Sequence, residues 1–398
     1  MSTASPVYLA ALGLVSALGR GQAATARGLF QGAGDALQLE EGWLPGRAAR
    51  VGRVAGALPA PPARLSALDS RMARLLLAAL EEIRGPLEEE LQHYGPARIG
   101  VVLGTSTSGI EAGERAIAGF AEDGALPPWF DYGAQEMGCP ARFLAELLGL
   151  TGPAFTVSTA CTSSGKALGS ARNLLRLGLC DAVITGGADS LCRLTLNGFA
   201  ALEAATSNRC NPMSRNRDGI NIGEAAVLFI LRRTPAAIEL LGLGESSDAH
   251  HISAPEPSGR GAEAALRMAL ADAGLVPERV RGYLNLHATA TPLNDEMESR
   301  AVARVLPGLP CGGTKPFTGH TLGAAAALEL ALCWLTLDPR HNPGRRLPPH
   351  LWDGVADPAL PVLNLAGPDS TLEAGGICLS SSFAFGGNNL VLAAGPAR

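Results

Sequence analysis

Residues 155–169 read Phe155-Thr-Val-Ser-Thr-Ala-Cys161-Thr-Ser-Ser-Gly-Lys-Ala-Leu-Gly169 and predict a buried strand, a tight turn and a helix in succession. β-Branched and aromatic residues before Cys161 favour a strand, and residues 170–177 continue with helical periodicity. Cys161 is expected at the turn, where the positive end of the helix would lower the thiol pKa and supply oxyanion donors. The alternative is a buried cysteine that acts as a small hydrophobic residue.

Composition limits the classes of function. The 398 residues are 47% hydrophobic and include 49 glycines, which suits a large core with many tight turns. The net charge of −5 argues against a nucleic-acid surface. The eight cysteines form no C-x-x-C pair, so we expect neither a metal site nor a disulfide scaffold. Lacking a leader and a long apolar run, the chain is expected to be cytoplasmic, without stable membrane insertion.

An internal duplication organises the chain. A strand, a helix, a strand with a small-residue loop, a strand–turn–helix and a strand with a glycine turn occur twice in the same order. The first series is 7–16, 66–84, 101–109, 157–166 and 182–187, and the second is 238–247, 261–273, 282–291, 314–323 with the alanine-rich helix after it, and 376–387. We therefore divide the chain into residues 1–234 and 235–398. Residues 22–31 are expected to be helical, 32–68 irregular and 225–231 a strand.

The alternation of apolar strands and helices predicts an α/β fold with parallel sheets covered on both faces. Chemistry in such folds collects at the carboxyl ends of the strands. Cys161, His287, His320 and Phe385 all follow predicted strands or stand at helix starts. Their convergence on one site argues against a purely structural role for Cys161.

The two histidines differ in setting. His287 ends a strand in a loop of Ala and Thr, and His320 stands before an alanine-rich helix. A helix start would lower the pKa of His320 and keep it neutral, as a base or hydrogen-bond donor must be. Lys315 is one of only two lysines, with Lys166, so we expect a lysine-specific role for it. Glu298 is a candidate partner for a buried lysine.

Other candidates are weaker. The backbone N–H of Phe385, in a glycine-rich loop without nucleotide-binding spacing, could complete an oxyanion hole with that of Cys161. Residues 208–223 are a structural loop or a partner contact. His250 and His251 lack a third metal ligand at useful spacing. Four arginines are either docking residues for an acidic partner or ordinary surface charges: Arg71, Arg74, Arg172 and Arg176.

Taken together, four motifs resemble the elongating β-ketoacyl-acyl-carrier-protein synthases of the two-histidine class. They are Thr159-Ala-Cys161-Thr-Ser-Ser, His287-Ala-Thr-Ala-Thr-Pro-Leu-Asn-Asp295, Thr314-Lys315-Pro-Phe-Thr-Gly-His320-Thr-Leu-Gly-Ala and Phe385-Gly-Gly-Asn. The resemblance spans nearly the whole chain. It implies the thiolase-like fold, an internally duplicated αβαβα five-layer sandwich, usually dimeric.

The resemblance also implies roles. Cys161 would take an acyl chain from an acyl carrier protein, and His287 and His320 would promote decarboxylation of the malonyl carrier and stabilise the enolate. Lys315, paired with Glu298, would support the histidines. The product would be a 3-oxoacyl carrier and CO2, formed without a cofactor because the carrier's phosphopantetheine holds the substrates.

For the rest of the site, the resemblance implies that Thr289 and Thr291 contact the pantetheine arm, and that Phe385 and Gly386 form the oxyanion hole and gate. The chain departs from the family at Ala288, Ala290 and Ala384, where glycine is usual. In the sequence of residues 384–389 and in its compact length, the chain resembles the synthases of aryl-polyene clusters.

The sequence is compatible with other functions. The chain could be a ketosynthase-like subunit that mainly shapes a partner's pocket, and the dimer could be a homodimer or a heterodimer with a second such subunit. A cysteine hydrolase is disfavoured because it leaves Lys315 and a second histidine without a role.

Overall fold

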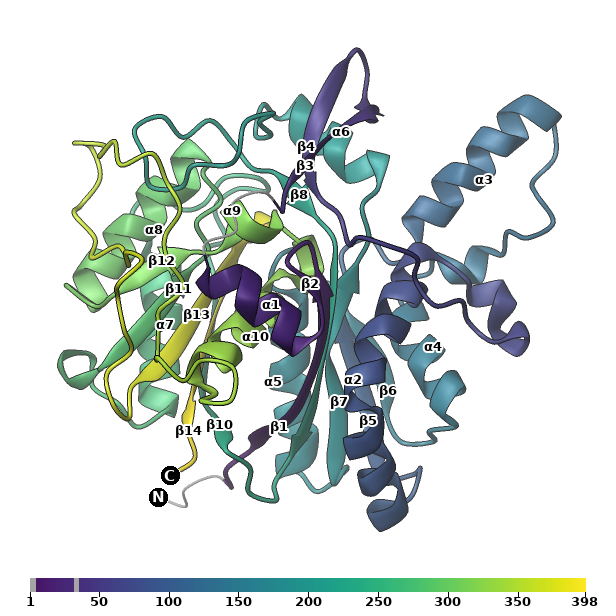
Figure 1. The fold of residues 1–398 in the computed structure, drawn as a ribbon, viewed down its shortest axis with the longest axis horizontal. Coiled ribbons are helices and arrows are strands. Elements are labelled where there is room, and N and C mark those ends of the chain that lie inside the picture. The colour runs from purple at the N-terminus through teal and green to yellow at the C-terminus, as the bar shows by residue number, and fades with distance from the viewer. Residues whose placement is uncertain (1–4, 32–35) are drawn as a thin grey trace.

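The computed structural model describes residues 5–31 and 36–398, and its main sheet has the same strand order on either side of its centre (Figure 1). The path is β12-β11-β13-β14-β10-β1-β9-β7-β5-β6. The first half contributes β1 (Tyr8–Ser16), β5 (Ile99–Gly104), β6 (Ala154–Val157), β7 (Ala182–Asp189) and β9 (Ala225–Arg232). The second half contributes β10 (Ile238–Ser247), β11 (Gly282–Leu286), β12 (Cys311–Gly313), β13 (Ile377–Ala384) and β14 (Asn388–Pro396).

The two halves of the sheet meet where β1 pairs with β10, in the register Tyr8 to Glu239. Counted outward from this junction, β9-β7-β5-β6 on one side matches β14-β13-β11-β12 on the other. This mirror order is the structural form of the predicted duplication. The predicted boundary after residue 234 falls between β9 and β10.

The sheet is mixed, so the prediction of parallel sheets was only partly right. β6, β5 and β7 are parallel, as are β12, β11 and β13. β9 and β14 run antiparallel to their neighbours and lead back to the centre of the sheet. β14 was not among the predicted strands. In both halves the parallel strands end at the same edge, which is where the predicted site residues lie.

Helices form three layers around the two half-sheets, which gives the five-layer sandwich (Figure 1). The central layer holds α5 (Ser163–Arg176) and α10 (Ala325–Leu337), which contact each other. The outer layers hold α2 (Arg71–Tyr94) and α4 (Cys139–Leu148) on one side, and α7 (Arg260–Asp272) and α8 (Pro292–Val305) on the other. The side chain of Ser70 caps α2 by accepting from the Ala73 N–H.

Smaller elements complete the chain. The helices are α1 (Gln22–Phe30), α3 (Ile110–Asp123), α6 (Arg193–Ala201) and α9 (Lys315–Thr318), and the short 3-10 turns are Ala63–Leu68, Tyr132–Ala134, Pro277–Arg279, Leu322–Ala324 and Phe385–Gly387. β2 (Gly19–Arg20) pairs with β1, and a separate sheet joins β3 (Gln38–Leu44), β4 (Arg47–Gly52) and β8 (Ile222–Gly223). The prediction that 32–68 is irregular was therefore wrong for the β3–β4 hairpin, and 32–35 lie outside the described residues.

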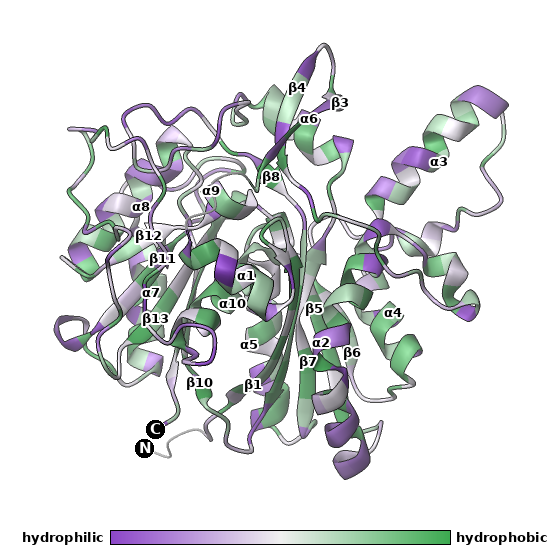
Figure 2. Ribbon diagram, viewed as in Figure 1, coloured by the Kyte–Doolittle hydropathy of each residue, from purple (hydrophilic) through white to green (hydrophobic). Residues whose placement is uncertain are grey.

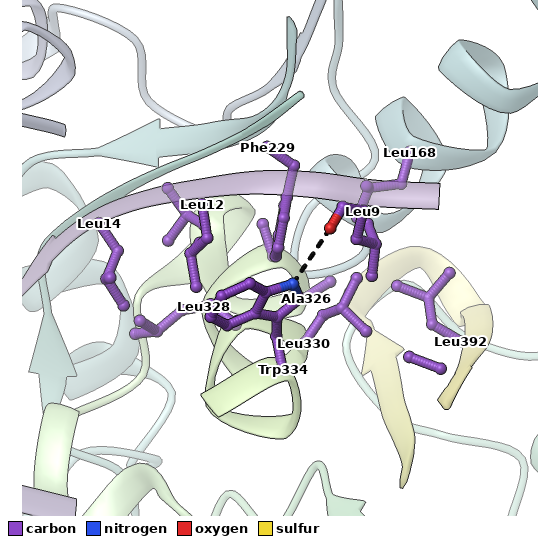
Figure 3. Close-up of a cluster of buried hydrophobic side chains, with 14 of the residues drawn as sticks. Leu9, Leu12, Leu14, Leu168, Phe229, Ala326, Leu328, Leu330, Trp334 and Leu392 are labelled. Atoms are coloured by element: carbon purple, nitrogen blue, oxygen red, sulfur yellow. Dashed lines mark hydrogen bonds between the residues drawn. The ribbon is translucent and has the colours of Figure 1, made fainter. Parts of the chain in front are cut away.

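The core lies between the layers. Leucines of β1 and β14 and apolar residues of α5 and α10 pack around Phe229 and Trp334 (Figure 3). The indole N–H of Trp334 donates to the carbonyl of Leu9 at 3.2 Å, so its polar atom is satisfied inside the core. Figure 2 shows β5 and β7 mainly in the colour of hydrophobic residues, as expected for strands covered on both faces. Within residues 5–31 and 36–398, no helix combines the length and apolar composition needed to cross a bilayer.

Candidate active site

Cys161 stands at the predicted turn between β6 and α5. The backbone N–H of Thr159 donates to Ser163 Oγ at 2.9 Å and closes this turn. Ala160, immediately before the cysteine, has a φ of 53°, a left-handed conformation that a non-glycine residue rarely adopts. Only 6% of Cys161 is exposed. The strained turn thus holds the thiol at the start of α5, with its surroundings largely closed to water.

The prediction of a lowered thiol pKa at Cys161 was wrong. Burial raises the pKa of Cys161 to about 11, although the charge of Lys315 and the backbone N–H groups of Phe385 and Cys161 act in the opposite direction. The loss of hydration outweighs the helix start because the sulfur is almost completely covered. These two N–H groups, of Phe385 and Cys161, are those expected to form an oxyanion hole. At neutral pH, Cys161 is a thiol that needs a base.

His320 supplies a base within reach. Its Nε2 lies 2.9 Å from Cys161 Sγ. The loop before β8 fixes its backbone, because the His320 N–H donates to Asn221 O at 2.7 Å and the His320 carbonyl accepts from Gly223 N at 2.9 Å. Burial, followed by the charge of Lys315, lowers the pKa of His320 well below its usual value. The imidazole is therefore neutral and able to accept a proton.

His287 follows β11 and faces the same point. The centroids of the His287 and His320 rings are 5.4 Å apart. Sγ of Cys161 and one ring nitrogen of each histidine all lie within 4.8 Å of one another. Lys315 Nζ donates to His287 Nδ1 at 3.3 Å, which leaves the proton of a neutral ring on Nε2. Burial and the charge of Lys315 lower the pKa of His287 well below its usual value. His287 can thus act as a neutral hydrogen-bond donor.

Lys315 is buried, as expected, but its carboxylate partner is Glu329 rather than Glu298. Lys315 Nζ forms a short ion pair with Glu329 Oε1 and also donates to the His287 carbonyl. Glu329 lies on α10, whose other described side chains are apolar apart from Thr336. A single carboxylate in an otherwise apolar helix could have indicated from the sequence that Glu329 pairs with a buried cation, because a buried charge needs a partner.

Glu298 instead fixes the backbone of the histidine loop. Its carboxylate accepts from the N–H groups of His287 and Ala288, both at 2.7 Å, and from Ser381 Oγ at 3.0 Å. Asp295 holds the next part of the loop by accepting from Ala290 N at 3.2 Å. Burial raises the pKa of Glu298 to about 7. The role of Glu298 here is to orient His287.

A cavity of about 290 Å³ reaches the three central residues. Thr289 and Thr291, predicted to contact a pantetheine arm, line this cavity, and their hydroxyl oxygens are 2.9 Å apart. Phe385 also lines it and stacks on Phe199 of α6, with 5.4 Å between ring centroids. Phe199 was not singled out from the sequence.

The turn at Phe385 and Gly386 is held by a backbone hydrogen bond to the loop that contains Ile252. Gly386 N donates to the carbonyl of Ile252 at 2.7 Å. Gly386 and Gly387 have φ values of 82° and 76°, which favour glycine, whereas Ala384 has a φ of −100°. An alanine at 384 therefore fits without backbone strain.

Several candidates lie outside the site. His250 and His251 are exposed. Arg71, Arg74 and Arg172 pair with Glu224, Asp69 and Asp272, and Arg176 donates to the Ser5 carbonyl. These four arginines are engaged within the chain, which removes the basis for assigning them to an acidic partner. The 208–223 loop proves structural at its end, where Asn221 and Gly223 hold His320.

Comparisons with known proteins agree with this geometry. Residues 60–237 match the family "Beta-ketoacyl synthase, N-terminal domain", and residues 237–345 match "Beta-ketoacyl synthase, C-terminal domain". Nodulation protein E of Rhizobium meliloti is 32% identical over 321 residues, which cover 74% of this chain and 75% of that protein. The 3-oxoacyl-[acyl-carrier-protein] synthase 2 of Synechocystis is 32% identical over 276 residues, 62% of each chain.

A solved structure matches over the whole chain. It is the ketosynthase ApeO in complex with its chain length factor ApeC from Xenorhabdus doucetiae. The matched chain is 44% identical, with a TM-score of 0.93, and the match covers 100% of this chain and 99% of that one.

Proposed function

Since this chain belongs to the β-ketoacyl synthase family, we propose that Cys161, His287 and His320 carry out a decarboxylative condensation on carrier-bound acyl chains. The chain is an acyltransferase of the 3-oxoacyl-acyl-carrier-protein synthase type. The observation that carries the assignment of residues is the approach of His320 Nε2 to Cys161 Sγ at 2.9 Å, with His287 beside them.

The first half-reaction loads Cys161. His320 Nε2 accepts the thiol proton, and the sulfur attacks the thioester carbonyl of the acyl carrier. The N–H groups of Cys161 and Phe385 stabilise the oxyanion, because both residues line the cavity that the carbonyl enters and both N–H groups act to lower the pKa of the thiol. The carbon–sulfur bond to the carrier breaks, and the carrier's thiol leaves with the proton held by His320.

The second half-reaction forms the carbon–carbon bond. The bond to the malonyl carboxylate breaks, CO2 leaves, and the electron pair moves into the thioester carbonyl as an enolate. Nε2–H of His287 stabilises that oxygen, and the nearby charge of Lys315 adds to this. His320 joins as a second donor in its Nε2–H tautomer, which it can adopt once Cys161 is acylated because His320 Nδ1 has no hydrogen-bond partner among the described residues. The enolate carbon attacks the Cys161 thioester, so the carbon–sulfur bond to Cys161 breaks and a 3-oxoacyl carrier forms. The released thiolate takes up one proton from solvent, which restores the thiol of the resting enzyme.

The chemistry of these steps requires no redox cofactor or metal, because two neutral donors and a lysine supply the stabilisation of the enolate. Thr289 and Thr291 are placed to hold the pantetheine arm, since both line the cavity that leads to Cys161. The acyl carrier protein is the partner that brings each substrate. We propose a cytoplasmic location for the protein.

The specific pathway is that of an aryl-polyene-type synthase with a chain-length-factor partner. Support comes from the 44% identity to ApeO, a ketosynthase solved with a chain length factor. β6 ends the sheet and has an exposed edge, where 40% of Phe155 is accessible. The region from α3 to α4 also exposes large apolar residues, namely Ile117, Phe120, Leu126, Trp129, Tyr132 and Met137. An open strand edge beside an apolar surface is typical of a dimer interface.

Two experiments test this proposal. The first is mass spectrometry of carrier-bound products from malonyl carrier with saturated, polyenoyl and aryl acyl carriers, with and without a chain-length-factor subunit. Cys161→Ala should abolish the 3-oxoacyl product, and unchanged turnover would refute the assignment of the nucleophile.

The second experiment is co-purification with the chain-length-factor subunit, followed by measurement of the mass of the complex. Phe155→Glu should weaken the complex, whereas Val362→Glu, at a surface residue that is 98% exposed, is the matched control. A complex with the same affinity in both variants would contradict the assigned face. A fully active homodimer would favour fatty-acid-type elongation without such a partner.

A further inference from the structure

His350 is a buried histidine that the proposed reaction does not use. It lies in the segment of the chain that connects α10 to β13, and only 6% of the residue is exposed. Its Nδ1 accepts from the backbone N–H of Gly313 at 2.9 Å, and its Nε2 lies 3.0 Å from the carbonyl of Pro212. Because an N–H must donate to Nδ1 and a carbonyl must accept from Nε2, the ring is held as the neutral Nε2–H tautomer.

Through Nδ1, the ring of His350 is hydrogen-bonded to β12, the strand that precedes Lys315. Gly313 is the last residue of β12, and Lys315 follows two residues later. There is no room for a side chain at Gly313, since a Cβ there would lie 2.5 Å from the Cβ of Ala288. β12 is therefore enclosed between His350 and the loop of His287, so a shift of the ring would move Lys315 relative to His287.

On the Nε2 side, the ring holds the loop that supports the second histidine. Pro212 precedes Met213, whose N–H donates to Asp295 Oδ2 at 2.8 Å. The same loop continues to Asn221, whose carbonyl accepts from the N–H of His320 at 2.7 Å. His350 thus joins the support of His320 to the strand of Lys315.

We propose that His350 is a positioning residue, whose two hydrogen bonds set the distance between the Lys315–His287 pair and the backbone that carries His320. Burial lowers the pKa of His350 to about 4, so the ring stays neutral at pH 7 and keeps its acceptor for Gly313. This role rests on the proposed function, because its consequence is the rate of malonyl decarboxylation.

The test separates the two hydrogen bonds. His350→Phe keeps a planar ring without either bond. The amide oxygen of His350→Asn can accept from Gly313 as Nδ1 does, and the longer His350→Gln can reach Pro212. The matched control is His93→Phe at the exposed end of α2. Each variant is assayed for decarboxylation of the malonyl carrier and, separately, for acylation of Cys161 by an acyl carrier, below its measured Tm.

We expect His350→Phe to lower the kcat of decarboxylation at least tenfold, with KM for the malonyl carrier within threefold of the wild type. Cys161 acylation should fall less than decarboxylation, because Gly223 and the contact of Ser164 with Ala327 still hold His320 beside Cys161. His350→Asn should recover part of the kcat, since it restores the bond to the strand of Lys315. An unchanged kcat in His350→Phe, or an equal loss in both assays, would overturn the role of His350. If His350→Phe does not fold, a kcat of His350→Asn no higher than that of His350→Gln would overturn it. A wild-type protein that neither decarboxylates nor condenses would refute the proposed function itself.

Discussion

Replacing Lys315 by methionine removes the one lysine of the site while keeping much of the side-chain volume. In the wild type, Nζ lies 3.3 Å from His287 Nδ1. The opposite ring nitrogen, Nε2, donates one hydrogen bond to the enolate oxygen. The width of the ring and this hydrogen bond, added to the 3.3 Å, place the enolate oxygen about 8 Å from the ammonium group of Lys315. At this distance a unit charge stabilises the enolate by about 2 kcal/mol with an effective dielectric constant of about 20, or about 30-fold in rate. Decarboxylation should therefore fall about 30-fold or more.

The pH dependence gives a second readout. The charge of Lys315 contributes to the lowered pKa of both His287 and His320. Without it, both pKa values rise, so the histidines become protonated at higher pH and the acidic limb of the decarboxylation profile moves upward. The assay is CO2 release from the malonyl carrier between pH 5 and 9.

The matched control is Lys166→Met, at the only other lysine of the chain, whose Nζ lies 4.0 Å from Glu245. A partly exposed pair of this kind contributes little, so its activity should stay within twofold of the wild type. The reasoning is refuted if Lys315→Met decarboxylates within threefold of the wild type, or if Lys166→Met loses as much activity as Lys315→Met.

Two further predictions concern buried ionisable groups. Glu329→Gln leaves Lys315 as an unpaired buried cation, so the free energy of unfolding should fall by about 3–5 kcal/mol, measured by urea denaturation; a midpoint equal to that of the wild type would contradict the ion pair. Because the pKa of Cys161 is raised to about 11, its rate of alkylation by iodoacetamide should still increase between pH 8 and pH 10, measured by mass spectrometry. A rate that levels off at pH 7 would show an acidified thiol instead.

Local patterns predicted the elements that carry the site. The β-branched and aromatic residues before Cys161 and the helical spacing after it form β6 and α5, because both signals depend only on neighbouring residues. The prediction that this strand is buried was wrong, because β6 is the edge strand of the sheet and Ala154 and Phe155 are exposed. The strand ends of the duplicated halves correctly indicated that Cys161, His287 and His320 converge. The repeat pattern was informative here because equivalent strands of each half end at the same edge.

What the sequence could not supply was pairing across the fold. Glu298 and Glu329 were both available to Lys315, and only the packing of α10 against the site decides for Glu329. The thiol pKa of Cys161 was predicted in the wrong direction because the degree of burial, which dominates it, is set by residues far apart in the chain. The hairpin of β3 and β4 was missed because Pro45 lies in its turn and Pro59, Pro61 and Pro62 follow it, and several prolines in one segment argue against strands.

The distance between nucleophile and base is set by how closely the two halves of the chain approach. Ser164, at the start of α5, accepts from the N–H of Ala327, at the start of α10, at 2.9 Å. A Cβ on Gly165 would lie 2.0 Å from the buried side chain of Leu390 of β14, so a larger residue at this point would displace Leu390 or separate the halves. Since Cys161 precedes α5 and His320 precedes α10, this contact fixes both residues at once. The site therefore belongs to the interface of the duplicated halves, and neither half alone contains a nucleophile and its base.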